Sequence, residues 1–475
     1  GFNKGRVLLH FGAVDQIAHI VLNGREVGSH VGGYEAFCFD ITDYLENENK
    51  LTVFCTDNLQ SAILPYGKQR ENRGGMWYTP VTGIWQTVWL ESVPERYIRA
   101  LKIDTGSDFA IITADGISEG TVTVHTPEGD VTVFLADSSA RVEVKNPRLW
   151  SPEDPYLYHF TVTAGEDRVT SYFALRTLEI RTVDGMPRLC LNGAEYFFHG
   201  LLDQGYYSDG IYTPASPDNY TRDIEEMKAL GFNTLRKHIK VEAEYFYSEC
   251  DRLGMIVFQD MVNNGRYSFL RDTALPTAGI KALSDRWMHR KKASRKSFED
   301  GMNATVRQLY NHPCVCYWTI FNEGWGQFNG TEMYEKLKAL DSSRFIDTTS
   351  GWFRGAKSDV ESIHVYFKPV KIKAGKKPVV LSEFGGYSYQ PQGHVFNPDK
   401  EYGYRFLKER EKFEDALTTL YEAEILPAVK QGLCAAIYTQ LSDVEDETNG
   451  LVSYDRKVLK VTPQKMLDIA EKFKR

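Results

Sequence analysis

The chain shows two different patterns of apolar and polar positions, one in its first part and one in the rest. Up to about residue 180, short runs alternate apolar and polar residues and are rich in Val, Thr, Phe and Trp, as in GTVTVHT and GIWQTVWLE. A period of two is typical of half-buried β-strands. Within IAHIVLNGREVGSH, Asn23-Gly24 separates two such runs, which predicts a tight hairpin. We therefore expect the first part of the chain to be all β.

The β-rich part divides at ESVPERYIRALKI, around residues 91–103, which has the character of a linker followed by a fresh set of strands. We expect one β-sandwich over residues 1–95. The later runs GTVTVHT, GDVTVFLA, ARVEVK and YHFTVTAG have the spacing of a second, small sandwich. We place that second domain at residues 96–183.

From residue 184 the rhythm changes to strands that alternate with helices. SPDNYTRDIEEMKALG and EAEYFYSECDRLG have a helical period and end in Gly, the residue typical of a helix C-terminus. Buried strands such as MIVFQDM and CVCYWTIF separate the helices, and eight strands are expected over residues 184–475. This order predicts a (β/α)8 TIM barrel. A doubly wound open sheet is the alternative, disfavoured because no Gly-rich phosphate loop follows any strand.

Composition excludes some function classes. The net charge is −8 and no basic block is present, which argues against nucleic acid and anionic membranes as partners. The sequence contains no run of 18 apolar residues, so no membrane-spanning helix is predicted. The aromatic fraction of 13% suits sugar rings but also ordinary β packing. The seven cysteines are scattered, and we interpret Cys314 and Cys316 as buried free thiols; no metal site and no cofactor are predicted.

The chain begins at Gly1 without Met, inside the strand-like run GRVLLHFGAV. We therefore expect the true N-terminus to be missing. The sequence leaves the cellular compartment open, and it leaves open an assembly of identical subunits.

Polar side chains occur where the barrel strands end. Because active sites of such barrels lie at the C-terminal ends of the strands, these side chains are expected to meet at one mouth. They are Asp203, Arg236, His238, Asp260, Asn322, Glu323, His364, Tyr366 and Glu383.

Two of these residues, Glu323 in YWTIFNEGWGQF and Glu383 in VVLSEFGGY, place a carboxyl on the fourth and seventh strands. Facing carboxyls can cleave a glycoside, one as acid and one as an ionised group that attacks the anomeric carbon. We expect Asn322 to bind a sugar hydroxyl, and Trp325 and Trp352 to stack on a sugar ring. Arg236, His364 and Tyr366 are expected to position Glu383.

Each of these residues also has a plain structural interpretation. A glutamate at a strand end is commonly solvated or caps a helix, and a histidine such as His238 or His364 is commonly a satisfied core residue. Asp260 can cap a loop, and Trp325 can serve packing. Their joint occurrence at successive strand ends favours the catalytic interpretation.

The motifs together resemble glycoside hydrolase family 2, which holds β-galactosidases, β-glucuronidases and β-mannosidases. HIVLNGREVGSHVGGYEAFCFDIT and TGIWQTVWLE resemble its sugar-binding jelly roll, and NPRLWSPEDPYLY its immunoglobulin-like domain. FNTLRKH, GMIVFQDM and FNEGWGQ are similar to its barrel motifs. The resemblance implies a partial jelly roll over 1–95, an immunoglobulin-like sandwich over 96–183 and the catalytic barrel over 184–475.

The resemblance also implies roles. Glu323, after Asn322, would be the acid/base, and Glu383 in LSEFGG the nucleophile of a retaining enzyme. The carboxyl separation expected for that class is about 5 to 5.5 Å. The implied function is a retaining exo-β-glycosidase that hydrolyses terminal β-linked sugars, most similar to a β-galactosidase, with a carbohydrate as its partner.

The chain departs from the family pattern in three places. We expect the jelly roll to lack its first strands, because the family has further residues ahead of GRVLLHFGAV. The Asn-x-Lys pair with which β-glucuronidases hold a sugar carboxylate is not evident in ETNGLVSYDRK, which disfavours glucuronides. The eighth strand ends in YTQLSDVEDETNG, where many relatives carry Trp.

Other functions stay open as alternatives. They are a β-glucuronidase or another family 2 specificity, an inactive carbohydrate-binding homologue, and a metal-dependent barrel hydrolase, for which the first strand offers only His199 and Asp203.

Overall fold

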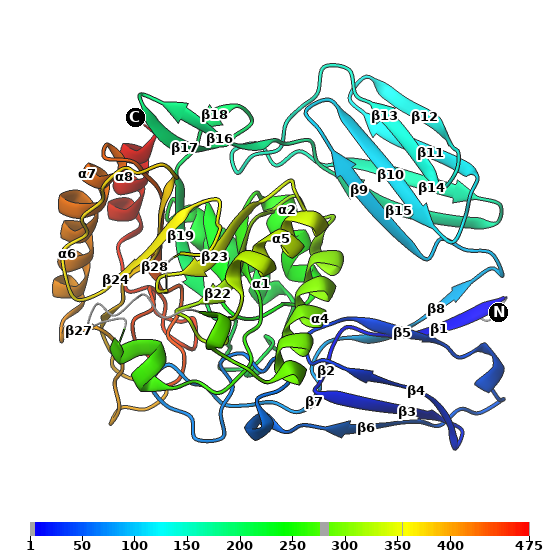
Figure 1. Ribbon diagram of the computed structural model, residues 1–475, viewed down its shortest axis with the longest axis horizontal. Coiled ribbons are helices and arrows are strands. Elements are labelled where there is room, and N and C mark those ends of the chain that lie inside the picture. Colours follow the sequence, from blue (N-terminus) through cyan, green and yellow to red (C-terminus); the bar gives the residue numbers. More distant parts are fainter. Residues whose placement is uncertain (1–4, 276–284, 354, 475) are drawn as a thin grey trace.

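The computed structural model describes residues 5–275, 285–353 and 355–474. Figure 1 shows two β-sandwiches, drawn blue and cyan, beside a barrel that is wrapped by helices. No helix within the described residues has both the length and the apolar character needed to cross a bilayer.

The N-terminal sandwich is built from two three-stranded antiparallel sheets, β5-β1-β8 and β4-β3-β6, with a short pair β2-β7. Its strands are β1 Arg6–Phe11, β2 Val14–Asp15, β3 Ile17–Leu22, β4 Arg25–Val31, β5 Phe37–Asp40, β6 Leu51–Thr56, β7 Gly83–Ile84 and β8 Val88–Val93. The predicted hairpin is confirmed: Leu22 pairs with Arg25, and Asn23 and Gly24 adopt positive φ angles of 54° and 76°. Short 3-10 turns occupy Thr42–Tyr44 and Leu59–Ser61.

The second sandwich packs sheet β13-β10-β9 against sheet β12-β11-β14-β15. Its strands are β9 Ala100–Thr105, β10 Phe109–Asp115, β11 Gly120–Thr126, β12 Gly129–Leu135, β13 Ser139–Glu143, β14 Tyr158–Ala164 and β15 Asp167–Phe173. Alternate residues of these strands, including Ile112, Val122, Val124 and Phe160, form its own buried cluster. The predicted period of two thus builds two inner faces, as in other sandwiches.

A small antiparallel sheet joins the sandwiches to the barrel. It comprises β16 Leu178–Val183, β17 Met186–Leu191 and β18 Ala194–Glu195. Arg188 on β17 donates to the carbonyls of Leu433 and Val429 at 3.1 and 3.0 Å, which fastens this sheet to the start of the last barrel strand. The domain boundaries at 95/96 and 183/184 stay predictions.

The barrel has eight parallel strands, in the order β23-β22-β21-β20-β19-β28-β25-β24. They are β19 Phe198–Asp203, β20 Thr234–Lys237, β21 Ile256–Asp260, β22 Val315–Asn322, β23 Phe345–Ser350, β24 Glu361–Val365, β25 Val379–Gly385 and β28 Leu433–Thr439. The end strands β23 and β24 lie in contact, so the sheet is nearly closed. The predicted fold class is confirmed.

Helices cover the outside of the barrel (Figure 1). They are α1 Asp218–Ala229, α2 Glu244–Leu253, α4 Lys292–Leu309, α5 Gly330–Leu340, α6 Arg410–Leu420, α7 Leu426–Val429 and α8 Pro463–Phe473. Shorter helical turns are Leu270–Ala274, Asp285–Trp287 and Tyr421–Ile425, and β26 Tyr387–Ser388 pairs with β27 Arg405–Phe406 near the barrel mouth. Helix α2 ends as predicted, with Gly254 at φ 74°.

Candidate active site

The two candidate carboxylates face each other at the barrel mouth. Glu323 directly follows β22, and its backbone N–H donates to the Ser350 carbonyl of β23 at 2.8 Å. Glu383 lies within β25, and one of its carboxylate oxygens lies within 4.8 Å of one from Glu323. The Glu323 side chain is 21% exposed and that of Glu383 only 6%. One acid therefore meets solvent while the other is enclosed.

Glu383 is held in its ionised form. Arg236 of β20 donates to its Oε1 at 3.0 Å, and the Tyr366 hydroxyl donates to its Oε2. Burial alone would raise the pKa of Glu383, but the charges of His364 and Arg236 outweigh burial and lower the pKa to about 2. Glu383 is therefore a carboxylate throughout the neutral range.

His364 of β24 links the two acids. Its Nδ1 lies 2.8 Å from Glu323 Oε1 and 3.6 Å from Glu383 Oε2, and its Nε2 lies 3.1 Å from the Ser350 hydroxyl. The ring is fully buried. With both ring nitrogens engaged, His364 fixes the direction in which Glu323 points.

Behind the acids lies a second layer of charge. Arg236 donates two hydrogen bonds of 3.0 Å to Asp260 and one of 2.8 Å to Asn322 Oδ1. His238 Nδ1 lies 2.7 Å from the same Asp260 carboxylate. Burial acts to raise the pKa of Asp260, but the Arg236 charge and the His238 contact lower it to about 2. These strand-end residues therefore form one connected network with Glu383.

Three other predicted site residues lie differently. Asp203 is buried and bonds to Lys237 at 2.6 Å. Trp325 is 3% exposed, packs edge-on against Tyr66 and Trp77, and so offers little free ring face. The ring of Trp352 lies 5.7 Å from that of His364, at the site. The substrate-binding roles of Asp203, Trp325 and Trp352 stay predictions.

Sequence reasoning missed a contribution from the N-terminal sandwich. Residues 62–82, here called the crossing segment, run between the Leu59–Ser61 turn and β7, and reach the loop that follows β28. Tyr78 donates to Glu447, and the Thr79 N–H donates to Glu445 at 2.8 Å. The signal was present as a basic run, YGKQRENR, and an acidic run, DVEDE, of opposite charge.

Two clusters in the described residues bring three potential metal ligands together. One is Glu323, His364 and Glu383, but Arg236 and Tyr366 already hold both oxygens of Glu383. The arrangement at Glu383 therefore suits a carboxylate paired with a guanidinium better than a metal ligand.

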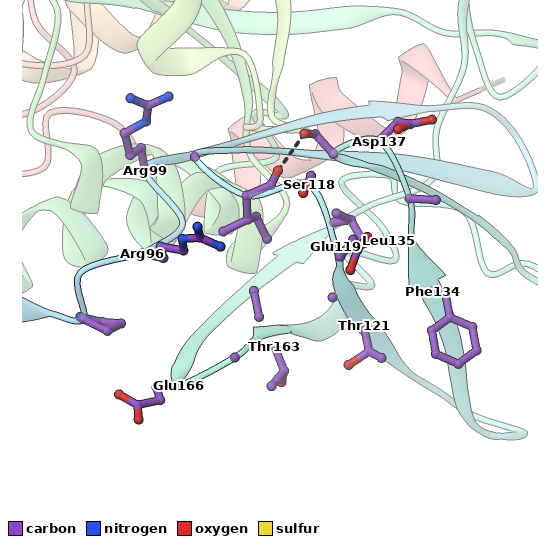
Figure 2. A pocket seen from close by; sticks show the side chains of 18 of the residues that line it. Arg96, Arg99, Ser118, Glu119, Thr121, Phe134, Leu135, Asp137, Thr163 and Glu166 are labelled. Carbon is purple, nitrogen blue, oxygen red and sulfur yellow. Dashed lines mark hydrogen bonds between the residues drawn. The ribbon is translucent and has the colours of Figure 1, made fainter.

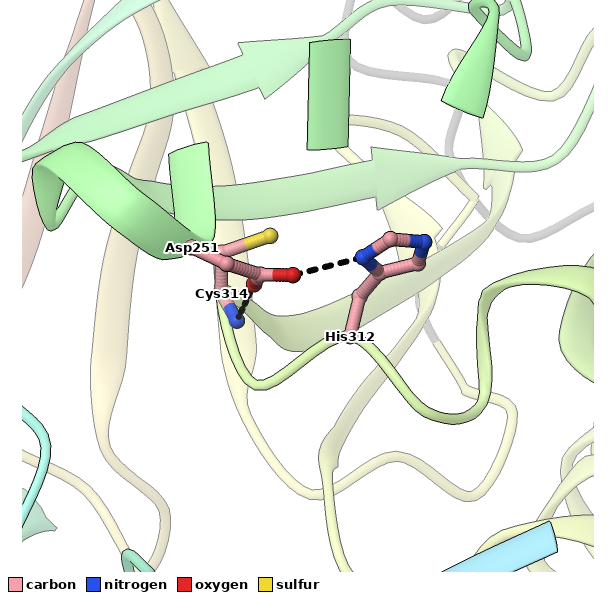
Figure 3. Close-up of side chains that lie close together, drawn as sticks. All are labelled: Asp251, His312 and Cys314. Carbon is pink, nitrogen blue, oxygen red and sulfur yellow. Dashed lines mark hydrogen bonds and ion pairs between the residues drawn. The ribbon is translucent and has the colours of Figure 1, made fainter. Parts of the chain in front are cut away.

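The other cluster comprises Asp251, His312 and Cys314 and lies where α2 ends and β22 begins (Figure 3). Asp251 bonds to His312 Nδ1 at 2.6 Å, to the Cys314 N–H at 2.7 Å and to the Tyr172 hydroxyl at 2.8 Å. Burial raises the pKa of the Cys314 thiol well above its ordinary value, so this sulfur stays protonated. The cluster joins the second sandwich to the barrel by hydrogen bonds.

A large open groove of about 1590 Å³ lies away from these acids, on the second sandwich. Figure 2 shows Arg96 and Arg99 of the linker on one side and Phe134 of β12 on the other. None of the strand-end residues of the barrel lines this groove. Despite its size, we do not treat this groove as a candidate active site.

Comparison with known families matches the three parts of the chain in order. Residues 2–94 match the sugar-binding domain of glycosyl hydrolases family 2, residues 104–176 match the domain described as glycosyl hydrolases family 2, and residues 188–394 match the family 2 TIM barrel domain. The chain belongs to glycoside hydrolase family 2. The predicted resemblance is thereby confirmed.

Relatives within family 2 carry different names. A β-galactosidase from Thermoanaerobacter pseudethanolicus is 25% identical over 84% of this chain and 56% of its own length. A β-glucuronidase from Bacteroides fragilis is 24% identical over 67% of this chain and 47% of its own. A solved β-D-glucuronidase of Dictyoglomus thermophilum superposes with a TM-score of 0.75 at 16% identity, covering 99% of this chain and 87% of that one. The chain spans about half the length of the curated relatives it matches.

The last barrel strand of this family 2 chain ends at Thr439, in the stretch where the sequence departs from the family pattern. The Thr439 hydroxyl lies 3.2 Å from the Tyr366 hydroxyl, which in turn donates to Glu383. The Tyr366 ring stacks on that of Tyr404 at 3.8 Å. A small hydroxyl side chain thus occupies the end of β28 next to the buried acid.

Proposed function

We propose that the chain is the core of a retaining exo-β-glycosidase that hydrolyses terminal β-galactosides or a closely related neutral sugar. The observation that carries this proposal is the approach of the Glu323 and Glu383 oxygens to within 4.8 Å across the barrel mouth. Retaining enzymes hold their two carboxyls about 5 to 5.5 Å apart, whereas inverting enzymes need about 6.5 to 9.5 Å to admit a water.

The environments of the acids support distinct roles. Glu383, with its pKa near 2, is ionised and buried, as a nucleophile requires. Glu323 is the more exposed of the two, so its carboxyl meets the side from which a leaving group departs. The network around Arg236 keeps the charge of Glu383 while His364 holds Glu323 in place.

The reaction follows in two steps. In the first, Glu323 gives its proton to the glycosidic oxygen as the Glu383 oxygen forms an ester bond with the anomeric carbon and the bond to the leaving group breaks. In the second, Glu323 takes a proton from water, the water oxygen attacks the anomeric carbon, and Glu383 is released as a carboxylate. The sugar leaves with its original configuration.

The sugar itself is the finer part of the proposal. Relatives named β-galactosidase and β-glucuronidase match at similar identity, so the comparisons favour neither. The galactoside is favoured by the missing Asn-x-Lys pair in ETNGLVSYDRK. Hydrolysis of a glucuronide in preference to every neutral sugar would refute this choice while leaving the glycosidase proposal intact.

A panel of 4-nitrophenyl β-glycosides tests the function, with Glu383→Gln and Glu323→Gln as the decisive variants. Glu383→Gln should abolish turnover of every substrate, because no ester can form. Glu323→Gln should lose activity on poor leaving groups, keep the first step on nitrophenyl substrates, and regain turnover with azide. Near-normal rates for Glu383→Gln would refute the assignment, and no turnover by the unmodified protein would favour a carbohydrate-binding homologue.

A further inference from the structure

The crossing segment forms one wall of the active-site mouth. Trp77 packs its ring 5.1 Å from that of Trp325, which follows Glu323 by two residues. The Tyr66 N–H donates to the Asn263 carbonyl at 3.1 Å, in the loop after β21. The segment is thereby fastened to two loops of the barrel mouth, and it carries Lys68 between these anchors.

Lys68 differs from the other buried lysines. Its side chain is 9% exposed, yet among the described residues no carboxylate lies within 4.0 Å of its ammonium. Its recorded neighbour is the Trp77 ring, with the ammonium 5.5 Å from the ring centre. Three other buried lysines each have an acid: Lys237 pairs with Asp203 at 2.6 Å, Lys240 with Glu242 at 2.9 Å and Lys460 with Asp443 at 2.6 Å. A largely enclosed lysine with no acid beside its ammonium points to a ligand that completes the site.

The surroundings of Lys68 are those of the catalytic centre. Burial raises the pKa of Glu447, and the Tyr78 hydrogen bond and the Lys68 charge act against that rise. Burial lowers the pKa of His238, and the Lys68 charge lowers it further. Tyr78, which donates to Glu447, also donates its N–H to the Lys68 carbonyl at 3.0 Å. The charge of Lys68 therefore acts on both Glu447 and His238, and its backbone is joined to that of Tyr78, the residue that donates to Glu447.

The charges around this position favour an uncharged ligand. The two acids whose pKa is about 2, Glu383 and Asp260, already share Arg236, and His364 lies between Glu383 and Glu323. A sugar carboxylate would bring a like charge close to the ionised Glu383. Hydroxyl groups instead let an ammonium donate and a carboxylate accept without adding charge.

We propose that Lys68 is a substrate-binding residue supplied by the N-terminal domain, and that with Glu447 it binds the hydroxyls of an uncharged pyranoside in the catalytic centre. This inference rests on the proposed glycosidase function. It assigns the selection of the sugar partly to a domain outside the barrel.

The test compares Lys68→Met with Lys50→Met, a matched change at an exposed lysine of the same domain. The substrates are the best neutral 4-nitrophenyl β-glycoside, its 3-, 4- and 6-deoxy analogues, and the corresponding uronide. With the parent sugar, kcat/KM of Lys68→Met should fall roughly 10- to 100-fold, the usual effect of losing a hydrogen bond to a charged group. Lys50→Met should match the unmodified protein.

The deoxy sugars separate recognition from general damage. One deoxy analogue should be a poor substrate of the unmodified protein. Replacing Lys68 should lower kcat/KM for that analogue only slightly further, because the hydroxyl that Lys68 binds is already absent. An equal loss on all analogues, or no loss on the parent, would overturn the inference. The inference would also be overturned if the unmodified protein preferred the uronide and replacing Lys68 reduced kcat/KM most for that substrate.

Two controls keep the test decisive. If Lys68→Met lowers the melting temperature, Lys68→Arg keeps the charge and should lose less activity with the same dependence on the deoxy position; a uniform loss would overturn the inference. If Glu383→Gln is inactive while Lys68→Met is fully active, only the role of Lys68 fails. If the unmodified protein hydrolyses nothing on the panel, the proposed function fails and this inference with it.

Discussion

Replacing Arg236 with Met removes the charge that holds the active-site carboxylates together. The guanidinium is 1% exposed and donates two bonds to Asp260, one to Glu383, one to Asn322 and one to the Ser382 carbonyl. Met approximates the length of the side chain but supplies no donor. Two buried carboxylates, Asp260 and Glu383, would then lose the cation that they share.

The expected size of the effect follows from these distances. Unit charges about 4 Å apart at an effective dielectric constant near 20 interact by about 4 kcal/mol. Losing this attraction should raise the pKa of Glu383 from about 2 to about 4 or 5, since 1.4 kcal/mol corresponds to about one pKa unit. Breaking a buried ion pair from one side also costs about 3 to 5 kcal/mol of folding free energy.

The sign of the pH effect is fixed by the direction of this pKa shift. In the unmodified protein the folded pKa of Glu383 lies below its ordinary value of 4.5, so ionised Glu383 stabilises the fold above about pH 4.5 and loses that effect as pH falls towards 2. In Arg236→Met this pH dependence of stability should shrink. The fraction of enzyme with an ionised nucleophile should instead fall as pH drops through 4 to 5.

The assay is the pH profile of kcat/KM on a nitrophenyl glycoside, which reports groups of the free enzyme. Arg236→Met should show a new acid limb between pH 4 and 5. The control is Arg344→Met, which removes another buried arginine, paired with Asp341 at 2.8 Å, away from the site. It should lower stability and leave the profile unchanged. Superimposable normalised profiles for Arg236→Met and the unmodified protein would refute the reasoning.

Three further predictions follow from single contacts. Dialysis against EDTA should leave turnover unchanged, because Arg236 and Tyr366 hold both Glu383 oxygens; a loss that a divalent metal restores would contradict this. Tyr366→Phe should lower kcat/KM by about 10-fold, the effect of one hydrogen bond to a charged acceptor, and an unchanged kcat/KM would count against that contact. Asp251→Asn should cost about 2 to 4 kcal/mol in urea denaturation without changing kcat, because Asp251 holds His312 and two other donors at the domain junction; wild-type stability would show that the junction contributes nothing.

Most of the fold follows from local pattern. The hairpin at Asn23-Gly24 and the barrel strands were predictable because alternation and turn residues are properties of neighbouring positions. The small sheet β16-β17-β18 was missed, since the expected barrel began at residue 184. Its strand MPRLCL has no sequence feature that reveals its partners, and Arg188 finds its acceptors only after the barrel has closed.

The candidate site likewise has features that the sequence predicts and features that it does not. Arg236, Asn322, His364 and Glu383 were predictable because parallel barrel strands bring their C-terminal ends to one mouth, whatever fills the loops. The surroundings of Trp325 were not predictable. Its ring is buried in edge-to-face contact with aromatic side chains of the crossing segment, and no local pattern indicates which distant loop will fold over a barrel.

The acidic loop after β28 is held in part by the crossing segment of the N-terminal sandwich. Four of its acids are buried: Asp443, Glu445, Asp446 and Glu447. The barrel supplies a cation for Asp443 through Lys460, whereas Glu445 and Asp446 face Arg73, and Glu447 accepts from Tyr78. Buried carboxylates need such partners to keep one conformation. The conformation of this acidic loop therefore depends on residues that precede the barrel by an entire domain. If the loop lines the proposed sugar site, we expect substitutions in the crossing segment to change the sugar preference without any change among the strand-end residues.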